Sequence, residues 1–384
     1  MGTPQKHLMI VAGEASGDMR AAGLVRALKN TGMRFSGVGG THMAGCGVEL
    51  FANIHDLAVI GIGDVIKNFN RIKQVFDRVL QRIDKDRPDA VLLVDYPGFN
   101  LRLAREIKKR GIKVIYYVSP QVWAWQENRV KTIKTLVDRM LVLFAFEKDI
   151  YAKYGMAVDH VGHPLVDEVV LTQPPASIRA SLGFKPTDKI IGLMPGSRPQ
   201  EIKRHLPVML GAAEILAQKN PAYRFLLLKA EPIPTTVIER HIKQAKVKVM
   251  VHDGPTYDGI GIIDLGIVAS GTATLETGLL LKPMVIMYKT TPLTYGLGKM
   301  LIKLPFIGLV NVVAGKKVIE EFIQDDATPT NIATAVQKIL SSPEAYGRLT
   351  NELAVLKASL GRPGASQRAA QIIQAELSPN QLLL

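Results

Sequence analysis

The chain has 384 residues, of which 47% are hydrophobic and 21% charged, a composition that excludes a disordered protein and predicts two globular domains. The single cysteine, Cys46, excludes a disulfide framework and a cysteine-based metal cluster, and is typical of a protein in a reducing cytosol. Lys and Arg outnumber Asp and Glu by 48 to 34, and the resulting formal charge of +14 favours an anionic partner, whether nucleic acid, an anionic lipid surface or a phosphorylated substrate.

No apolar run reaches the roughly 18 residues that a membrane-spanning helix requires. The first residues lead into a strand-like segment and not into the apolar core of a signal peptide. We therefore expect a protein that is soluble or bound to a membrane surface.

Residues 7–30 predict a strand, a loop and a helix. The loop holds Glu14, Ser16, Gly17 and Asp18, and a glycine-rich loop after the first strand of an α/β unit is a common ligand site. It lacks the Gly-Lys-Ser/Thr end of a P-loop, and no dinucleotide-binding fingerprint follows it. Glu14 and Asp18 are open to two interpretations, acids of an active site or caps of the helix.

Residues 57–87 combine an apolar run with a helix whose apolar stripe is interleaved with basic residues. An amphipathic crossover helix packed on a sheet explains this pattern. A basic, apolar-tipped surface that touches anionic lipid also explains it, and the two interpretations are compatible.

The segment DAVLLVDYPGFN (89–100) predicts a buried strand that ends at Asp95, then a Pro97-Gly98 turn and a helix. A carboxylate at the carboxyl end of a parallel strand faces the crevice in which ligands bind. Desolvation there raises the pKa of the carboxyl group, which suits a general base. Asp95 is therefore the leading candidate for a catalytic base, and a cap of the following helix is the alternative.

Two histidines, His160 and His163, lack a third ligand for a metal, so packing is the simpler interpretation. The sequence contains no zinc, calcium or magnesium pattern, and we expect neither a metal nor a cofactor.

A proline-rich, polar stretch at 171–177 predicts an interdomain linker. We expect an N-terminal Rossmann-like domain at 1–170, a second at 171–355, and a helical segment at 356–384 that packs back on the first domain or on a partner chain. Strands and helices alternate in both halves, which predicts parallel sheets with right-handed crossovers.

The stretch 264–282 is the centre of the predicted binding site. It predicts a short strand from Leu265 to Ala269, a tight Ser270-Gly271 turn, and a helix that opens at Thr272, whose side chain can cap the first turn. The helix start suits a phosphate, and Glu276, one turn further, can accept hydrogen bonds from ribose hydroxyls. A capped helix with a surface glutamate is the alternative.

The turn MPGSR (194–198) places Ser197 and Arg198 at the end of another strand, just before a helix. The forked, permanently charged guanidinium of Arg198 can neutralise a diphosphate leaving group. The later segment LVNVVAGKKV adds Asn311 near a third loop.

Seven motifs occur in order along nearly the whole chain, namely VAGEASGD, LLVDYPGFN, YVSPQVWAW, VGHPLVDE, MPGSR, SGTATLE and LVNVVAG. Together they resemble the lipid-A-disaccharide synthases, bacterial glycosyltransferases of the GT-B architecture. The resemblance implies two Rossmann-like α/β domains that face each other across a cleft. It also implies an inverting transfer from UDP-2,3-diacylglucosamine to 2,3-diacylglucosamine 1-phosphate, which gives a β-1,6-linked disaccharide 1-phosphate and UDP.

The resemblance further implies roles for the candidate residues. Asp95 would take the proton of the acceptor 6-hydroxyl, with Glu14 and Asp18 as substitutes. The diphosphate would be held by Arg198, beside Ser197, and by the helix start at Gly271, Thr272 and Ala273, while Glu276 would hold the ribose and Asn311 the nucleotide. The acceptor side would be lined by Glu14, Ser16, Gly17 and Asp18.

Because both substrates carry acyl chains, the resemblance implies a peripheral enzyme on the cytoplasmic face of the inner membrane, bound to anionic lipid through the 57–87 surface. Two other functions are open. A UDP-N-acetylglucosamine 2-epimerase would share the fold and the nucleotide site, and a nucleic-acid-binding protein is suggested by charge alone. The oligomeric state is open too, with a homodimer among the expected states.

Overall fold

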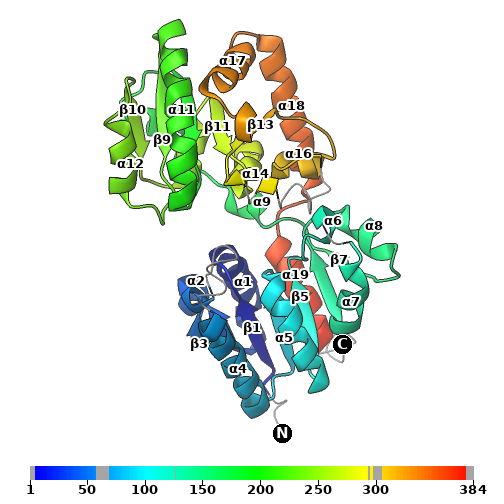
Figure 1. The fold of residues 1–384 in the computed structure, drawn as a ribbon. Helices are drawn as coiled ribbons and strands as arrows, with labels where there is room; N and C mark the ends of the chain where they lie inside the picture. Colours follow the sequence, from blue (N-terminus) through cyan, green and yellow to red (C-terminus); the bar gives the residue numbers. More distant parts are fainter. Residues whose placement is uncertain (1–4, 58–68, 126, 293–294, 297–304, 378–384) are drawn as a thin grey trace. The chain divides into compact units, whose positions relative to one another are not determined.

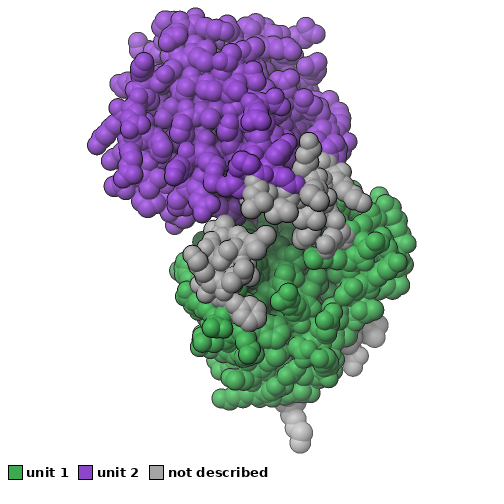
Figure 2. Space-filling model, in the orientation of Figure 1, with its two compact units in different colours: residues 1–164, 360–384 green, residues 165–359 purple. Residues whose placement is uncertain are grey.

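The computed structural model describes residues 5–57, 69–125, 127–292, 295–296 and 305–377 (Figure 1). The chain forms two compact units: residues 1–164 with 360–384 are unit 1, and residues 165–359 are unit 2 (Figure 2). Each unit contains one wholly parallel sheet with helices packed on it. The predicted α/β class with two Rossmann-like domains is confirmed.

Unit 1 is built on a seven-stranded sheet with the order β3-β2-β1-β4-β5-β6-β7. Its strands are β1 (His7–Ala12), β2 (Arg34–Gly39), β3 (Glu49–Asn53), β4 (Ala90–Val94), β5 (Lys113–Tyr117), β6 (Arg139–Val142) and β7 (Asp159–His160). Its helices are α1 (Ala15–Leu28), α2 (Thr41–Gly45), α4 (Phe69–Asp86), α5 (Pro97–Lys109), α6 (Val122–Trp125), α7 (Arg129–Leu136), α8 (Glu147–Ala152) and α19 (Ala365–Leu377), with 3₁₀ turns at Lys29–Thr31 and Ile54–Asp56.

The apolar strands of unit 1 alternate their side chains between two helix layers. Met9, Val91 and Val114 point to the face covered by α4, α5 and α7, where they join Val79, Leu103 and Ile133 in one core. The other face is covered by α1 and α19, which pack on each other. The strands are buried on both faces, as the continuous apolar runs of the sequence predicted.

Unit 2 is built on a six-stranded sheet with the order β10-β9-β8-β11-β12-β13. Its strands are β8 (Lys189–Met194), β9 (Tyr223–Leu228), β10 (Val249–His252), β11 (Leu265–Ala269), β12 (Met284–Tyr288) and β13 (Glu321–Ile323). Its helices are α9 (Leu165–Glu168), α10 (Pro175–Ser181), α11 (Pro199–Lys219), α12 (Thr235–Ile242), α13 (Thr256–Ile262), α14 (Thr272–Leu279), α16 (Leu309–Ala314), α17 (Pro329–Leu340) and α18 (Pro343–Ser359), with a 3₁₀ turn at Gln324–Asp326.

The strand order of each sheet reverses at one point, and this positions the candidate sites. In unit 1, β1 pairs with β2 on one side and β4 on the other; in unit 2, β8 pairs with β9 and β11. The loops after the two central strands therefore diverge, and open α/β sheets bind ligands at such switch points. The loops concerned carry Glu14 and Asp95 in unit 1, and Arg198 and Ser270 in unit 2.

The stretch 171–177 is not the linker that its composition predicted. The backbone N–H of Thr172 donates to the carboxylate of Asp258 at 2.7 Å, and α10 begins at Pro175, so this stretch belongs to the fold of unit 2. The units divide at 164/165 and again at 359/360. Composition misled here because prolines also occur at the first turn of a helix.

The end of the chain returns to unit 1. Helix α18 lies in unit 2 and spans the expected boundary at residue 356, whereas α19 packs on α1 of unit 1. There the Cα of Gly23 comes so close to Ser366 that an added Cβ would lie 3.0 Å from the Ser366 Oγ. Lys113 of β5 also pairs with Glu376 of α19.

The predicted lipid-contacting surface at 57–87 is only partly described, because residues 58–68 lie outside the described ranges. Helix α4 packs Val75, Val79 and Ile83 in the core and exposes basic residues such as Lys73 and Arg78, as an amphipathic crossover helix should. Among the helices that the structure describes, none is long and apolar enough to cross a membrane.

Candidate functional site

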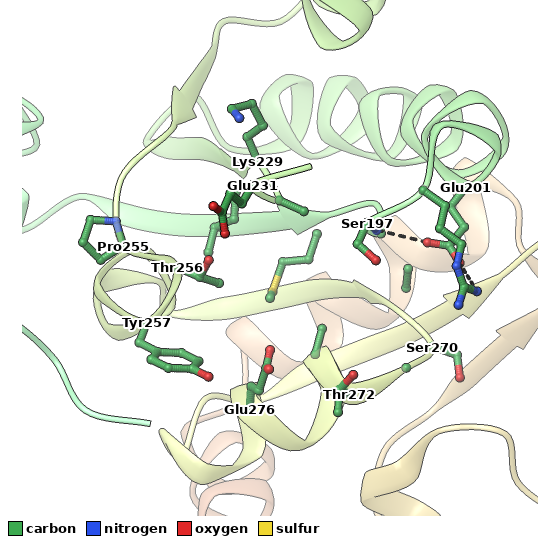
Figure 3. A pocket seen from close by; sticks show the side chains of 18 residues that line it. Ser197, Glu201, Lys229, Glu231, Pro255, Thr256, Tyr257, Ser270, Thr272 and Glu276 are labelled. Carbon is green, nitrogen blue, oxygen red and sulfur yellow. Dashed lines mark hydrogen bonds and ion pairs between the residues drawn. The ribbon is translucent and has the colours of Figure 1, made fainter. Parts of the chain in front are cut away.

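A pocket of about 570 Å³ opens at the switch point of unit 2 (Figure 3). The loops that follow β8, β9, β10 and β11 all contribute to it. It brings together the six residues predicted in the two nucleotide-binding turns, which are Ser197, Arg198, Gly271, Thr272, Ala273 and Glu276. This volume is in the range of small-molecule binding sites.

The turn from β11 into α14 forms one wall of the pocket. Gly271 is the N-cap of α14, and Thr272 is the first helical residue and not the cap that the sequence predicted. No side chain of the described residues caps this helix, so the N–H groups at its start are available to an anion. Ser270 donates its hydroxyl to the carbonyl of Ile307 at 2.8 Å, which fixes the turn to the loop before α16.

The turn from β8 into α11 forms the facing wall. Gly196 has a φ of +115°, and an added Cβ would meet the Glu201 carboxylate at 2.3 Å, so this position requires glycine. The Glu201 carboxylate accepts the N–H of Ser197 at 3.0 Å and pairs with Arg198 at 3.3 Å (Figure 3). The Arg198 side chain is 51% exposed, so its guanidinium can also reach a ligand in the pocket.

His205, which no sequence motif singled out, holds this turn in place. His205 of α11 is fully buried; its Nδ1 donates to the carbonyl of Pro195 at 2.8 Å and its Nε2 accepts the N–H of Lys289 at 3.0 Å. The ring therefore joins the β8–α11 turn to the end of β12. Only its place on the buried face of a helix could have signalled this role.

The far end of the pocket was also missed. Tyr257 of α13 lies near Glu276 (Figure 3), and burial, followed by the negative charges of Glu276 and Glu168, raises the pKa of its phenol. The side chain of Lys229, after β9, is 7% exposed and pairs with Asp253 at 2.7 Å. These residues follow the ends of β9 and β10, so the strand pattern alone could have suggested them as lining residues.

Asn311 does not line the pocket, which corrects its predicted direct role. Its amide is fully buried and makes four hydrogen bonds. The Nδ2 donates to Ile319 O and to the Glu321 carboxylate, each at 2.8 Å, and the Oδ1 accepts the N–H groups of Val318 and Ile319. Glu321 in turn accepts the N–H groups of the loop to which Ser270 is bonded. Asn311 therefore supports the Ser270 turn through Glu321.

In unit 1, Asp95 lies in a strained turn between β4 and α5. Asp95 and Tyr96 have φ values of +50° and +48°, which non-glycine residues adopt at a cost of about 1–2 kcal/mol each. The turn is held from two sides, because the Tyr116 hydroxyl and the Asn100 amide both donate to the Asp95 carbonyl, at 2.6 and 2.7 Å. Strain that is maintained in this way points to a functional position.

The Asp95 carboxyl group combines burial with one nearby cation. Burial raises its pKa, and Arg20 of α1, whose Nη1 is 3.8 Å away, opposes this rise, as does the N–H of Tyr96. The side chain is nevertheless 31% exposed, so a substrate can reach it. A reachable carboxylate with a raised pKa has the properties of a general base.

The glycine-rich loop after β1 lies against the Asp95 turn. Gly13 is required there, because an added Cβ would lie 2.3 Å from the Tyr96 ring. Glu14 is exposed at the N-cap position of α1, and its charge, after burial, raises the pKa of Tyr96. Ser16 is half-buried and Gly17 is buried against the sheet.

Asp18 is placed differently from its neighbours. It is 1% exposed and accepts the N–H groups of Gly40, His42 and Met43 at 2.6–3.1 Å. The carboxylate thus satisfies the start of α2, a helix other than the one the sequence predicted it to cap. Such a buried, fully bonded acid anchors the loop, and this arrangement does not support its use as a substitute base.

The two histidines after β6 are packing residues. His163 is 2% exposed beside Phe144, and burial, aided by the charge of Arg20, lowers the pKa of its imidazole to about 3. Within the described ranges no three side chains of metal-ligating type come together. Glu147, which no sequence motif singled out, is 3% exposed, and burial raises the pKa of its carboxyl group to about 7.

The sequence matches the family described as lipid-A-disaccharide synthetase over residues 8–375. It is 44% identical over 368 residues to a lipid-A-disaccharide synthase of Syntrophus aciditrophicus, with 95% of this chain and 96% of that protein covered. It is also 44% identical over 370 residues to the lipid-A-disaccharide synthase of Geobacter sulfurreducens, with 96% of each covered.

Solved structures share the fold at low sequence identity. The UDP-GlcNAc 2-epimerase of Neisseria meningitidis, bound to UDP-GlcNAc, is similar with a TM-score of 0.65 and 14% identity, covering 96% of this chain and 99% of that one. The calicheamicin glycosyltransferase CalG4 is similar with a TM-score of 0.63 and 14% identity, covering 99% and 100%. Because an epimerase and a glycosyltransferase both share it, the fold does not choose between these two activities, and the family match does.

Proposed function

The chain belongs to the lipid-A-disaccharide synthetase family, as its motifs predicted, and from that membership we propose its reaction in detail. It is a UDP-sugar-dependent glycosyltransferase. Its donor is UDP-2,3-diacylglucosamine and its acceptor is 2,3-diacylglucosamine 1-phosphate, and the products are the β-1,6-linked disaccharide 1-phosphate and UDP. The family membership sets aside the two alternatives, an epimerase and a nucleic-acid-binding protein.

In this proposal Asp95 of unit 1 is the general base. Its carboxylate takes the proton of the acceptor 6-hydroxyl as that oxygen bonds to the anomeric carbon of the donor, and the bond from that carbon to UDP breaks. The attack comes from the face opposite the leaving group, which inverts the anomeric centre. The raised pKa of Asp95 and its strained, well-supported turn support this assignment. Glu14, exposed beside this turn, is the remaining candidate for a second acid.

Unit 2 holds the UDP moiety in this proposal. The N–H groups at the start of α14 and the guanidinium of Arg198 stabilise the charge that develops on the departing diphosphate. Glu276 accepts hydrogen bonds from the ribose. The pocket at the unit 2 switch point, with these groups on facing walls, is the single observation that supports the assignment best.

The proposal is tested by mass spectrometry of the products formed from the two lipid sugars, with and without acceptor and with and without a chelator. We expect a disaccharide 1-phosphate and UDP only when the acceptor is present. Conversion of the donor without acceptor would instead indicate epimerisation or hydrolysis. Dependence of the transfer on a metal would contradict the assignment of diphosphate stabilisation to Arg198 and α14 alone.

We also propose that the enzyme works as a peripheral protein on the cytoplasmic face of the inner membrane. The formal charge of +14 and the acyl chains of both proposed substrates support this. Flotation with vesicles in a salt series tests it. Binding should require anionic lipid and weaken as salt rises, and binding that ignores both would contradict the proposal.

A further inference from the structure

A groove of about 240 Å³ lies between α5 and α7 of unit 1. Helix α5 contributes Leu101, Arg102 and Arg105. Arg105 is four residues after Leu101 and three after Arg102, so the three side chains lie on one face of the helix. Helix α7 contributes Arg129 and Leu136 from the opposite side. The groove therefore has three guanidinium groups around a partly apolar floor.

Two of the three arginines in this groove form no ion pair within the described part of the chain. Arg102 and Arg105 are exposed, and neither makes a hydrogen bond or ion pair with any other residue that the structure describes. The next three cations of the same segment differ, because Lys108, Lys109 and Arg110 pair with Asp138, Glu106 and Asp84. No acidic residue lines the groove. Cations gathered in this way repel one another unless an anion joins them.

The type of cation indicates the type of anion. Arginine presents a planar fork of donors that matches the oxygens of a phosphate, and a phosphomonoester carries nearly two negative charges at neutral pH. Leu101 and Leu136 add apolar surface beside the charges, which suits an amphiphile better than a free inorganic ion.

The groove begins close to the proposed base. Pro97 and Gly98 line it, and Pro97 is two residues after Asp95. In a hexosamine 1-phosphate, C1 bears the phosphate and C5 bears the 6-hydroxymethyl group. Both carbons are bonded to the ring oxygen, so two bonds separate C1 from C5. A phosphate in the groove therefore keeps the sugar ring within reach of the Asp95 turn.

We propose that this arginine groove binds the phosphate of the acceptor, a phosphomonoester on an acylated sugar, and so positions the acceptor hydroxyl for Asp95. This inference rests on the proposed function, and it assigns the recognition of the acceptor phosphate to unit 1. Arg102 and Arg105 contact the phosphate, and Leu101 and Leu136 contact the apolar part of the acceptor.

The test combines a double variant with two acceptors. Transfer by the wild type and by Arg102→Gln/Arg105→Gln is measured in detergent micelles, with 2,3-diacylglucosamine 1-phosphate and with 2,3-diacylglucosamine, which lacks the phosphate. With the phosphorylated acceptor we expect the variant to lose on the order of 10²-fold in kcat/KM, mainly through KM, because two charge-assisted hydrogen-bonding groups are removed. With the other acceptor we expect less than a threefold change. The variant should also lose the preference for the phosphorylated acceptor.

The matched control is Lys131→Gln/Lys134→Gln, which removes two cations of α7 that do not line the groove and should leave both rates unchanged. An equal loss with both acceptors, or no loss with either, would overturn the proposal. So would full transfer in micelles combined with lost binding to anionic vesicles, because the groove would then bind membrane headgroups. Failure of the wild type to transfer to either acceptor would instead contradict the proposed function.

Discussion

The charge of Arg20 should set the pH at which the enzyme loses activity in acid. Arg20 lies on α1 with 10% of its side chain exposed, and its Nη1 is 3.8 Å from the Asp95 carboxylate. Its positive charge favours the ionised form of Asp95, so Arg20→Gln should raise the pKa of Asp95 further above its ordinary value. A base that is protonated at higher pH moves the acid limb of the kcat/KM profile to higher pH.

The size of the shift follows from the distance between the two charges. At 3.8 Å, unit charges interact by about 1 kcal/mol in water and about 4 kcal/mol at the effective dielectric constant of a protein surface. Because 31% of the Asp95 side chain is exposed, solvent screens the pair, and the lower part of this range applies. About 1–2 kcal/mol corresponds to roughly one pH unit.

The assay is kcat/KM for transfer between about pH 5 and 9 in a constant-ionic-strength buffer. Below the limb the variant should be about tenfold slower than the wild type, and on the alkaline plateau the two should agree. Arg26→Gln, on the same helix, is the control, because the Arg26 guanidinium donates to the Cys46 sulfur and its charge does not act on Asp95. An unmoved limb, or a limb at lower pH, would refute either the pairing or the role of Asp95 as the base. The other neighbour of Arg20, His163, has a pKa of about 3 and does not titrate in this range.

Three further predictions follow from groups described above. Asp95→Asn should fold normally but lose on the order of 10²–10⁴-fold in turnover, measured with saturating substrates. Near-wild-type turnover would show that Asp95 is not the base and would leave Glu14 as the candidate. Glu147→Gln should remove a pH dependence of stability. The carboxyl group of Glu147 stays protonated in the folded state up to about pH 7. The free energy of unfolding of the wild type should therefore fall by about 3 kcal/mol as the pH rises from about 4.5 through 7. Urea melts at pH 5 and pH 8 should show a smaller difference in the variant. Asn311→Ala should lower the free energy of unfolding by about 2–4 kcal/mol and weaken UDP binding, because the buried partners of Asn311 lose their hydrogen bonds. Loss of UDP binding at unchanged stability would instead indicate that Asn311 contacts the nucleotide directly.

The sequence predicted the parts of the site that depend on local pattern. Apolar runs placed β4 and β11, and the polar residues directly after them, Asp95 and Ser270, had to lie at the carboxyl edges of their sheets. The same reasoning identified the turn that carries Arg198. These predictions needed only the knowledge that a buried parallel strand ends where its ligand site begins.

The parts that the sequence could not predict depend on partners far away along the chain. Asp18 is bonded to residues 22–25 positions later, and His205 to Lys289, 84 positions later. A short polar side chain can serve a ligand or a distant backbone equally well, and its neighbours in sequence do not distinguish the two. The resemblance implied that Asn311 positions the nucleotide, but its amide is fully hydrogen-bonded within unit 2.

The return of α19 to unit 1 has a consequence for the order of events during synthesis. Unit 2 is a continuous stretch, residues 165–359, so its whole sequence is translated before that of α19. Unit 1 begins first but lacks the helix that covers α1 until α19 has left the ribosome. The nascent protein therefore carries an uncovered apolar face on its first domain throughout the synthesis of its second, and a chaperone is expected to bind this face.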